Sequence, residues 1–137
     1  MAAKNSKTKS TKEKFDYKQI KSFEDACNKL GIDPHNLPEV SLLPDDTKKA
    51  IIAYYKLIII YKAINNGWVP NWKNSNQYKY YPWFYMLASG FGFSYSGYIC
   101  TITSAVVGSR LCVSSSEQAL YIAKQFEAEY IDFFTNK

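Results

Sequence analysis

The sequence predicts an α+β fold with two N-terminal helices, a small antiparallel β-meander, and a C-terminal helix packed on the sheet. Helical periodicity over residues 45–65 and 115–134 is the first observation behind this prediction. The second is a series of short aromatic and β-branched runs, separated by glycine and serine, between residues 78 and 113. The length of 137 residues suits one domain, which we place at residues 15–137 after a flexible lysine-rich arm over residues 1–14.

The first 21 residues, which include the arm, carry all of the excess charge. Residues 1–21 hold seven lysines against Glu13 and Asp16, a net charge of +5, whereas residues 23–137 hold ten basic and ten acidic residues. The folded body therefore has no net field with which to attract nucleic acid. The arm itself has two interpretations, a solvated tail or a weak tether for nucleic acid through counterion release. The second would use Lys4, Lys7, Lys9, Lys12 and Lys14.

Local signals place the two N-terminal helices. Ser22 followed by Asp25 is a weak capping box, and Gly31 can end the first helix in a left-handed conformation. Pro44 suits the start of the second helix, which runs to about Asn65 and is apolar around most of its girth. We expect it to be central, covered on more than one side, and too short and too interrupted by lysine to cross a membrane.

We expect four short strands at residues 78–87, 91–95, 98–103 and 109–113, joined by turns rich in glycine and serine. The last helix should begin at Ser115, which forms a capping box with Gln118, and carry an apolar stripe to Phe133.

Twelve of the 23 aromatic residues fall between Trp68 and Tyr98. Laid out as a strand, residues 78–87 have two apolar or amphipathic faces, so one face packs on the central helix and the other needs a cover. Two interpretations stay open, a wholly internal role as core, or a surface that binds a partner. The binding interpretation would use Trp68, Trp72, Tyr78, Tyr81, Trp83 and Tyr85.

Arg110 is the sole arginine of the chain. It follows Gly108 and Ser109 and lies among residues of strand character. One interpretation is a guanidinium that reaches inward to backbone carbonyls or to a helix carboxylate. The other is a clamp for an anion or a carboxylate beside the aromatic surface.

The sequence offers no catalytic or metal-binding signature. His35 is the only histidine, and no GxSxG motif accompanies it. Cys27, Cys100 and Cys112 have no CxxC spacing, which argues against zinc and favours buried thiols in a reducing compartment. We therefore predict no enzyme activity, no cofactor and no metal.

Three segments carry a family resemblance: "GWVPNWKNSNQYKYYPWF", "GFGFSYSGY" and "VGSRLCVSSSEQALYIAKQFEAEY". Over about residues 20–134 the chain resembles a group of small uncharacterised proteins from phages and prophages of Bacteroides-type gut bacteria. Many of that group have phenylalanine where this chain has Val113. The resemblance implies a phage-encoded protein made in a bacterial cytoplasm, or carried in the virion, and implies no mechanism.

The sequence thus predicts a non-enzymatic, phage-derived structural or binding module that presents an aromatic surface to a protein partner or to itself. The alternative is a nucleic-acid-associated protein, in which the lysine-rich arm supplies phosphate affinity and the rings stack on unpaired bases.

Overall fold

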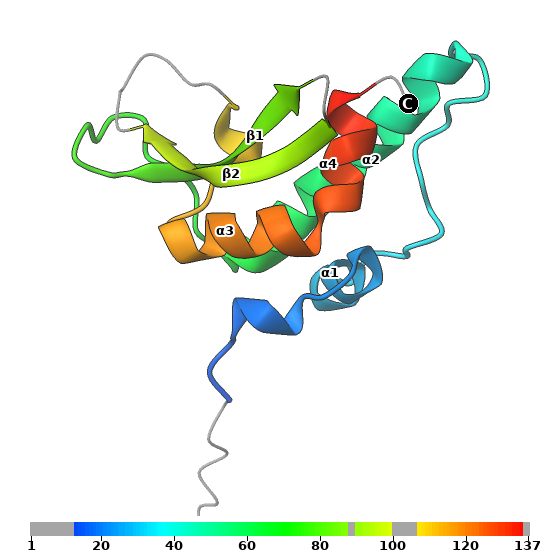
Figure 1. Ribbon diagram of the computed structural model, residues 1–137. Coiled ribbons are helices and arrows are strands. Elements are labelled where there is room, and N and C mark those ends of the chain that lie inside the picture. The colour runs from blue at the N-terminus through cyan, green and yellow to red at the C-terminus, as the bar shows by residue number, and fades with distance from the viewer. Residues whose placement is uncertain (1–12, 88–89, 100–106, 136–137) are drawn as a thin grey trace, which may run out of the picture.

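The computed structural model describes the backbone of residues 13–87, 90–99 and 107–135, and the side chains of residues 13–86 and 107–135. A long helix, α2, lies beside a β-hairpin, and shorter helices cover both (Figure 1). The elements in chain order are η1 (Tyr17–Gln19), α1 (Phe23–Leu30), α2 (Asp45–Asn65), β1 (Lys79–Leu87), β2 (Gly90–Ile99), η2 (Ser109–Leu111), α3 (Ser116–Gln125) and α4 (Glu127–Phe134).

The first two α-helices begin and end at the signals found in the sequence. The Ser22 hydroxyl accepts a hydrogen bond from the Asp25 backbone N–H at 3.1 Å, and Gly31 adopts the left-handed conformation that closes α1. Asp45 and Asp46 lie in the first turn of α2, where carboxylates complement the helix dipole. Asn66 ends α2 in a left-handed conformation with φ 46°.

The predicted β-meander is wrong, because the described residues form a single two-stranded antiparallel hairpin. The expected turn at Ser96-Gly97 lies inside β2, where these residues pair with Pro82 and Tyr81. A glycine opposite a tyrosine is tolerated in a strand, since the ring covers the exposed backbone. A β-bulge follows at Trp83 and Phe84. Residues 100–103 of the expected third strand lie outside the described residues.

The predicted strand over residues 109–113 is also absent. Residues Ser109–Leu111 form the 3₁₀-helix η2, and only Val113 forms a β-bridge, with Tyr80. Tyr80 and Val113 exchange two backbone hydrogen bonds of 2.9 Å, so the polar backbone groups of Tyr80 point away from β2. The next residue of β1 with this orientation is Pro82, which has no N–H to donate. The ladder therefore stops after one pair.

The single C-terminal helix predicted from the sequence is two helices that meet at Phe126. Phe126 departs from helical geometry (φ −117°, ψ 30°) and is buried. Figure 1 shows the change of direction between α3 and α4. The bend lets α3 contact the hairpin while α4 contacts α2, which one straight helix could not do.

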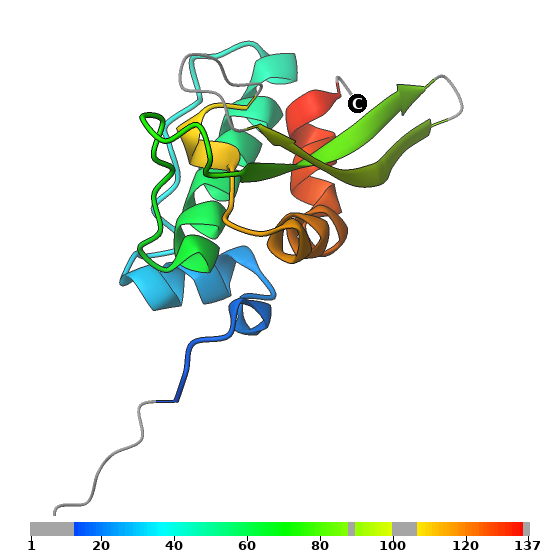
Figure 2. The same cartoon turned by 90° about the vertical axis from the view of Figure 1, so that its left-hand side faces the viewer.

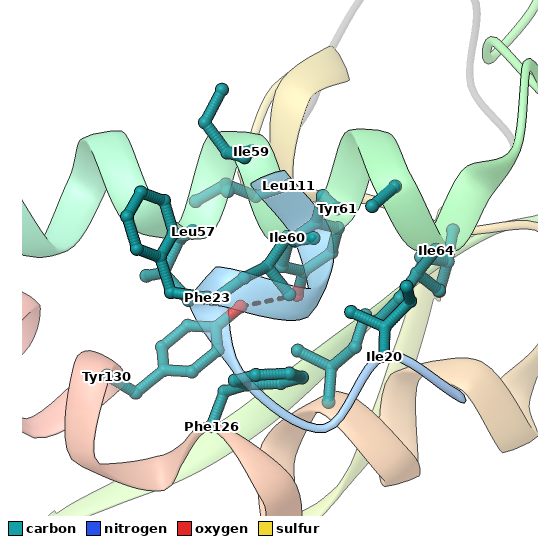
Figure 3. Close-up of a cluster of buried hydrophobic side chains, with 14 of the residues drawn as sticks. Ile20, Phe23, Leu57, Ile59, Ile60, Tyr61, Ile64, Leu111, Phe126 and Tyr130 are labelled. Atoms are coloured by element: carbon teal, nitrogen blue, oxygen red, sulfur yellow. Dashed lines mark hydrogen bonds between the residues drawn. The ribbon is translucent and has the colours of Figure 1, made fainter. Parts of the chain in front are cut away.

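The core is centred on α2, which contacts α1, α4, η1 and η2. Its members include Ile60 and Ile64 of α2, Phe23 of α1 and Phe126 beside α4 (Figure 3). Tyr61 of α2 and Tyr130 of α4 are buried within it, and their hydroxyl groups share a hydrogen bond. Burial raises the pKa of both phenols well above the ordinary value, so both stay neutral.

We expect the Tyr61–Tyr130 pair to show non-additive energetics. Tyr61→Phe or Tyr130→Phe leaves one buried hydroxyl without its partner and should lower the free energy of unfolding by about 1–3 kcal/mol. The double variant removes both hydroxyls and should lose clearly less than the sum of the two single changes. Urea unfolding of the three variants measures this.

Tyr54→Phe is the matched control, since Tyr54 lies on α2 and stacks on Phe133 with ring centroids 5.2 Å apart. Its hydroxyl has no hydrogen-bond partner among the residues that the structure describes. Strictly additive losses in the double variant would show that the two phenols are not coupled.

Candidate functional site

The seven residues predicted to bind a partner lie in two places. Trp68 and Arg110 line one cleft, which we call the cationic cleft, and Trp72 donates a hydrogen bond to Ser109 beside Arg110. Tyr78, Tyr81, Trp83 and Tyr85 belong to β1 or precede it. The exposed end of β1, around Trp83 and Tyr85, is called the hairpin surface.

The cationic cleft has a volume of about 600 Å³ and is bordered by α1, α2, residues 66–70 and η2. Three cationic side chains line it, those of Lys29, Lys62 and Arg110, and no carboxylate does. Trp68 and Val69 supply apolar surface beside them. The cleft thus brings together Trp68 and Arg110, both of which were selected from the sequence. Lys29 and Lys62 were missed, because only the packing of α1 against α2 brings them to the same cleft.

A sharp reversal of the chain builds one wall of this cleft. Asn66 (φ 46°) and Gly67 (φ 90°) both have positive φ, a conformation that glycine adopts without strain. The Trp68 N–H then donates to the Asn65 carbonyl at 2.9 Å, and Pro70 is buried. The chain therefore turns back at the end of α2 and places Trp68 in the wall of the cleft.

A hydrogen-bonded linkage holds η2 against the end of α2. The Asn65 side-chain amide donates to the Cys112 carbonyl at 3.0 Å, while its Oδ1 is buried with no hydrogen-bond partner in the described part of the chain. On the other side, the Trp72 indole N–H donates to the Ser109 hydroxyl at 2.6 Å. These contacts fix the backbone on both sides of Arg110, although its own side chain is exposed.

The charges of the cleft are only partly accounted for by the fold. Lys29 and Lys62 lie in the last turns of α1 and α2, where cations complement the helix dipole, and the Lys29 ammonium sits 3.9 Å from the centroid of the Phe15 ring. Arg110 has no such role, because η2 is only three residues long. Neither Lys62 nor Arg110 forms an ion pair with any residue for which the structure gives a side chain.

Lys79 is a buried cation that was not recognised from the sequence. It is fully buried, and its ammonium donates to the carbonyls of Asn74 and Gln77 at 3.1 and 3.0 Å. The same ammonium lies 5.1 Å from the centroid of the Trp72 ring. The loop from Trp72 to Gln77 therefore wraps around Lys79, and this arrangement gives Trp72 a structural role as well.

The hairpin surface consists of Trp83, Tyr85 and Met86 on β1 with Phe134 at the end of α4. These side chains are 40%, 51%, 58% and 40% exposed, respectively. A hollow of about 220 Å³ adjoins them, lined also by Tyr81 and Val107. Tyr81 is only 6% exposed, so it contributes little area, and Tyr78, 50% exposed, lies at the opposite end of β1.

Exposure rises along β1 on both of its faces. Lys79 and Tyr81 are buried on one face and Pro82 on the other, whereas Trp83, Tyr85 and Met86 are exposed. Phe84 marks the limit of the packed part, with its ring centroid 4.5 Å from that of Tyr130. Figure 2 shows the reason, because the far end of the hairpin runs past α4 and projects beyond the helices.

The sequence carries a second signal for this surface that was missed, since residues 80–109 contain no Asp, Glu, Lys, Arg or His. Proteins commonly protect exposed strands against unwanted association with charged side chains, above all lysine. Such protection is missing from this hairpin. Its exposed rings therefore lie within an uncharged region of 30 residues.

The histidine and the two described cysteines form no arrangement suited to catalysis or metal binding. His35 is exposed, and its Nδ1 lies 3.1 Å from an Asp33 carboxylate oxygen in a turn. Burial raises the pKa of the Cys112 thiol to about 11 and raises that of Cys27, which disfavours the nucleophilic thiolate. In the described ranges, no group of His, Cys, Asp and Glu could hold a metal ion.

Two further predictions concern the termini and the membrane. Of the lysines predicted to contact nucleic acid, Lys4, Lys7, Lys9 and Lys12 lie outside the described residues, and Lys14 is exposed. Among the helices that the structure describes, none combines the length and the apolar character needed to cross a bilayer.

Comparisons of the chain with protein-family models, curated proteins and solved structures found no match. The two surfaces are therefore interpreted from the geometry and chemistry of this chain.

We expect Lys79→Met to destabilise the protein by about 2 kcal/mol or more, because it removes a charged donor that satisfies two carbonyls. It should also loosen Trp72 and shift the tryptophan emission. Urea unfolding and fluorescence measure the two effects. Lys73→Met is the matched control, since Lys73 is an exposed lysine of the same loop. Equal stability of the two variants would contradict a structural role for the Lys79 ammonium.

Proposed function

We propose that the protein is a non-enzymatic, phage-derived binding module that presents the hairpin surface to a protein partner. The observation that carries the proposal is the exposure of Trp83, Tyr85, Met86 and Phe134 at a hairpin end that projects from the helices. Its phage origin and its place in the host cytoplasm or the virion depend on the sequence resemblance alone.

The chemistry of the surface favours a protein as the occupant. Tryptophan, tyrosine and methionine provide large contact areas, and interfaces concentrate binding energy in tryptophan and tyrosine. The hollow beside Trp83 and Phe134 can accept an apolar side chain. Because residues 80–109 carry no charge, binding here should depend on apolar contact and respond weakly to salt.

Two features make the hairpin suitable for this role. Its base is anchored, because Phe84 packs on Tyr130 and the bridge between Tyr80 and Val113 ties β1 to the segment before α3. Its far end projects past α4 (Figure 2), and Trp83, Tyr85 and Met86 on it are exposed to a partner. A rigid base with an accessible end presents the rings at low entropic cost.

The test is site-specific crosslinking in the producing bacterium, with the photoreactive residue benzoylphenylalanine in place of Tyr85. We expect one discrete product, identified by mass spectrometry, whose partner binds the purified protein. Trp83→Ala should weaken that binding by about 30-fold, the loss typical of an interface hot spot. Raising the salt concentration to 1 M should change it little.

Leu42→Ala is the matched control, because Leu42 is an apolar side chain that is 97% exposed and lies in the loop before α2. It should leave binding unchanged. A crosslink to a second copy of the chain, confirmed by sedimentation, would identify the partner as the protein itself. Absence of any Tyr85 crosslink, or equal binding by Trp83→Ala and the wild type, would overturn the proposal.

The nucleic-acid alternative makes a different prediction. Binding that uses the lysine-rich arm should fall steeply as salt rises and should disappear when residues 1–14 are removed. Filter binding with single-stranded DNA at several salt concentrations measures both. Binding that survives removal of the arm would exclude the arm as its source.

A further inference from the structure

We propose that the cationic cleft is a binding site for a nucleoside phosphate, with the phosphate on Arg110 and Lys62 and the base against Trp68. This site is separate from the hairpin surface, and nucleotide binding to it does not depend on the proposed protein partner. Three features of the cleft support it: its charge, its mixture of apolar and cationic groups, and the fixed position of η2.

Charge is the first feature. Residues 23–137 have no net charge, yet the side chains of Lys29, Lys62 and Arg110 line one cleft that has no carboxylate in its lining. Within the described ranges, Lys62 and Arg110 have no acidic partner, and both are exposed. A phosphate with a charge near −2 compensates such a group of cations better than a single carboxylate does.

The second feature is the apolar surface beside these cations. Trp68 is half-buried, and Val69, 73% exposed, continues the apolar wall next to it. An inorganic anion would leave this wall in water, whereas a base can stack on an indole while its phosphate meets the cations. The volume of about 600 Å³ is that of a site for a small organic molecule.

Fixed backbone geometry is the third feature. Arg110 belongs to η2, which is held from one side by the Trp72–Ser109 hydrogen bond and from the other by the Asn65–Cys112 hydrogen bond. The backbone of Trp68 is held at the end of α2 by the reversal at Asn66 and Gly67 and by its hydrogen bond to the Asn65 carbonyl. Only the guanidinium and the lysine chains need to be ordered when a ligand binds, which limits the entropic cost.

The sole arginine makes the test direct, since it gives one side-chain Nε–H signal in an NMR spectrum. Titration with AMP should shift this signal and the indole N–H signal of Trp68 together, and both shifts should saturate at one dissociation constant. Adenosine should bind at least tenfold more weakly, because it lacks the phosphate. Inorganic phosphate should shift the Arg110 signal and leave the Trp68 signal unchanged.

Variants identify the contacts. Arg110→Gln and Lys62→Gln should each weaken AMP binding at least fivefold, as followed by the indole N–H signal of Trp68. Trp68→Leu should weaken it to the same extent, as followed by the Nε–H signal of Arg110. Lys73→Gln removes an exposed lysine that does not line the cleft and should have no effect. Trp83→Ala should bind AMP normally, which separates this site from the hairpin surface.

A nucleoside phosphate can be a free nucleotide or the phosphorylated end of a single strand. Titration with a 5′-phosphorylated hexathymidylate distinguishes the two. Binding at least tenfold tighter than that of AMP would indicate the end of a single strand as the ligand, and equal or weaker binding would indicate a free nucleotide. Lack of any joint shift of Arg110 and Trp68 at 5–10 mM AMP would overturn the proposal. Undiminished AMP binding by both Arg110→Gln and Lys62→Gln would overturn it as well.

Discussion

The hydrogen bond between Tyr61 and Tyr130 joins the central helix α2 to α4, the helix on which the base of the hairpin packs. Tyr61 belongs to α2 and Tyr130 to α4, and Phe84 of β1 packs on the Tyr130 ring. Burying two hydroxyl groups is unfavourable unless each satisfies the other, so this contact admits one register of α4 on α2. That register determines where the base of the hairpin rests and how far its end projects.

Pro82 determines the shape of the sheet in a comparable way. Because it removes a donor at the edge of β1, the segment before α3 can pair only at Tyr80 and Val113. That segment then forms η2 instead of a strand, which carries Arg110 toward α2 and away from the hairpin. One residue thus separates the aromatic surface from the cationic cleft.

The sequence correctly predicted the helices whose ends are marked by signals within a few residues. Ser22, Gly31 and Pro44 are signals that act within a few residues, and the first two helices lie where these signals place them. The meander failed because glycine and serine mark turns and also occur within a hairpin strand, as Gly97 does. No glycine or proline marks the bend at Phe126 in the sequence. The bend arises because α3 packs on the hairpin while α4 packs on α2.

The sites were predictable only in part, for the same reason. Trp68 and Arg110 were recognised as unusual residues, but their proximity depends on the reversal at Gly67 and on the failure of the last strand. Lys79 was not recognised because its burial depends on the loop from Trp72 to Gln77, whose backbone carbonyls accept from its ammonium. Tyr81 was grouped with Trp83 by strand alternation, although the packed base of the hairpin covers one and its projecting end exposes the other.

The buried thiol of Cys112 gives the protein an internal reporter of its own opening. With a pKa of about 11, the thiol is ionised in only about one molecule in a thousand at pH 8. Because the sulfur is buried and mostly protonated, alkylation should be slow in the folded protein. The chain has two further cysteines, Cys27 and Cys100, so labelling located at Cys112 by mass spectrometry would report local opening beside Arg110.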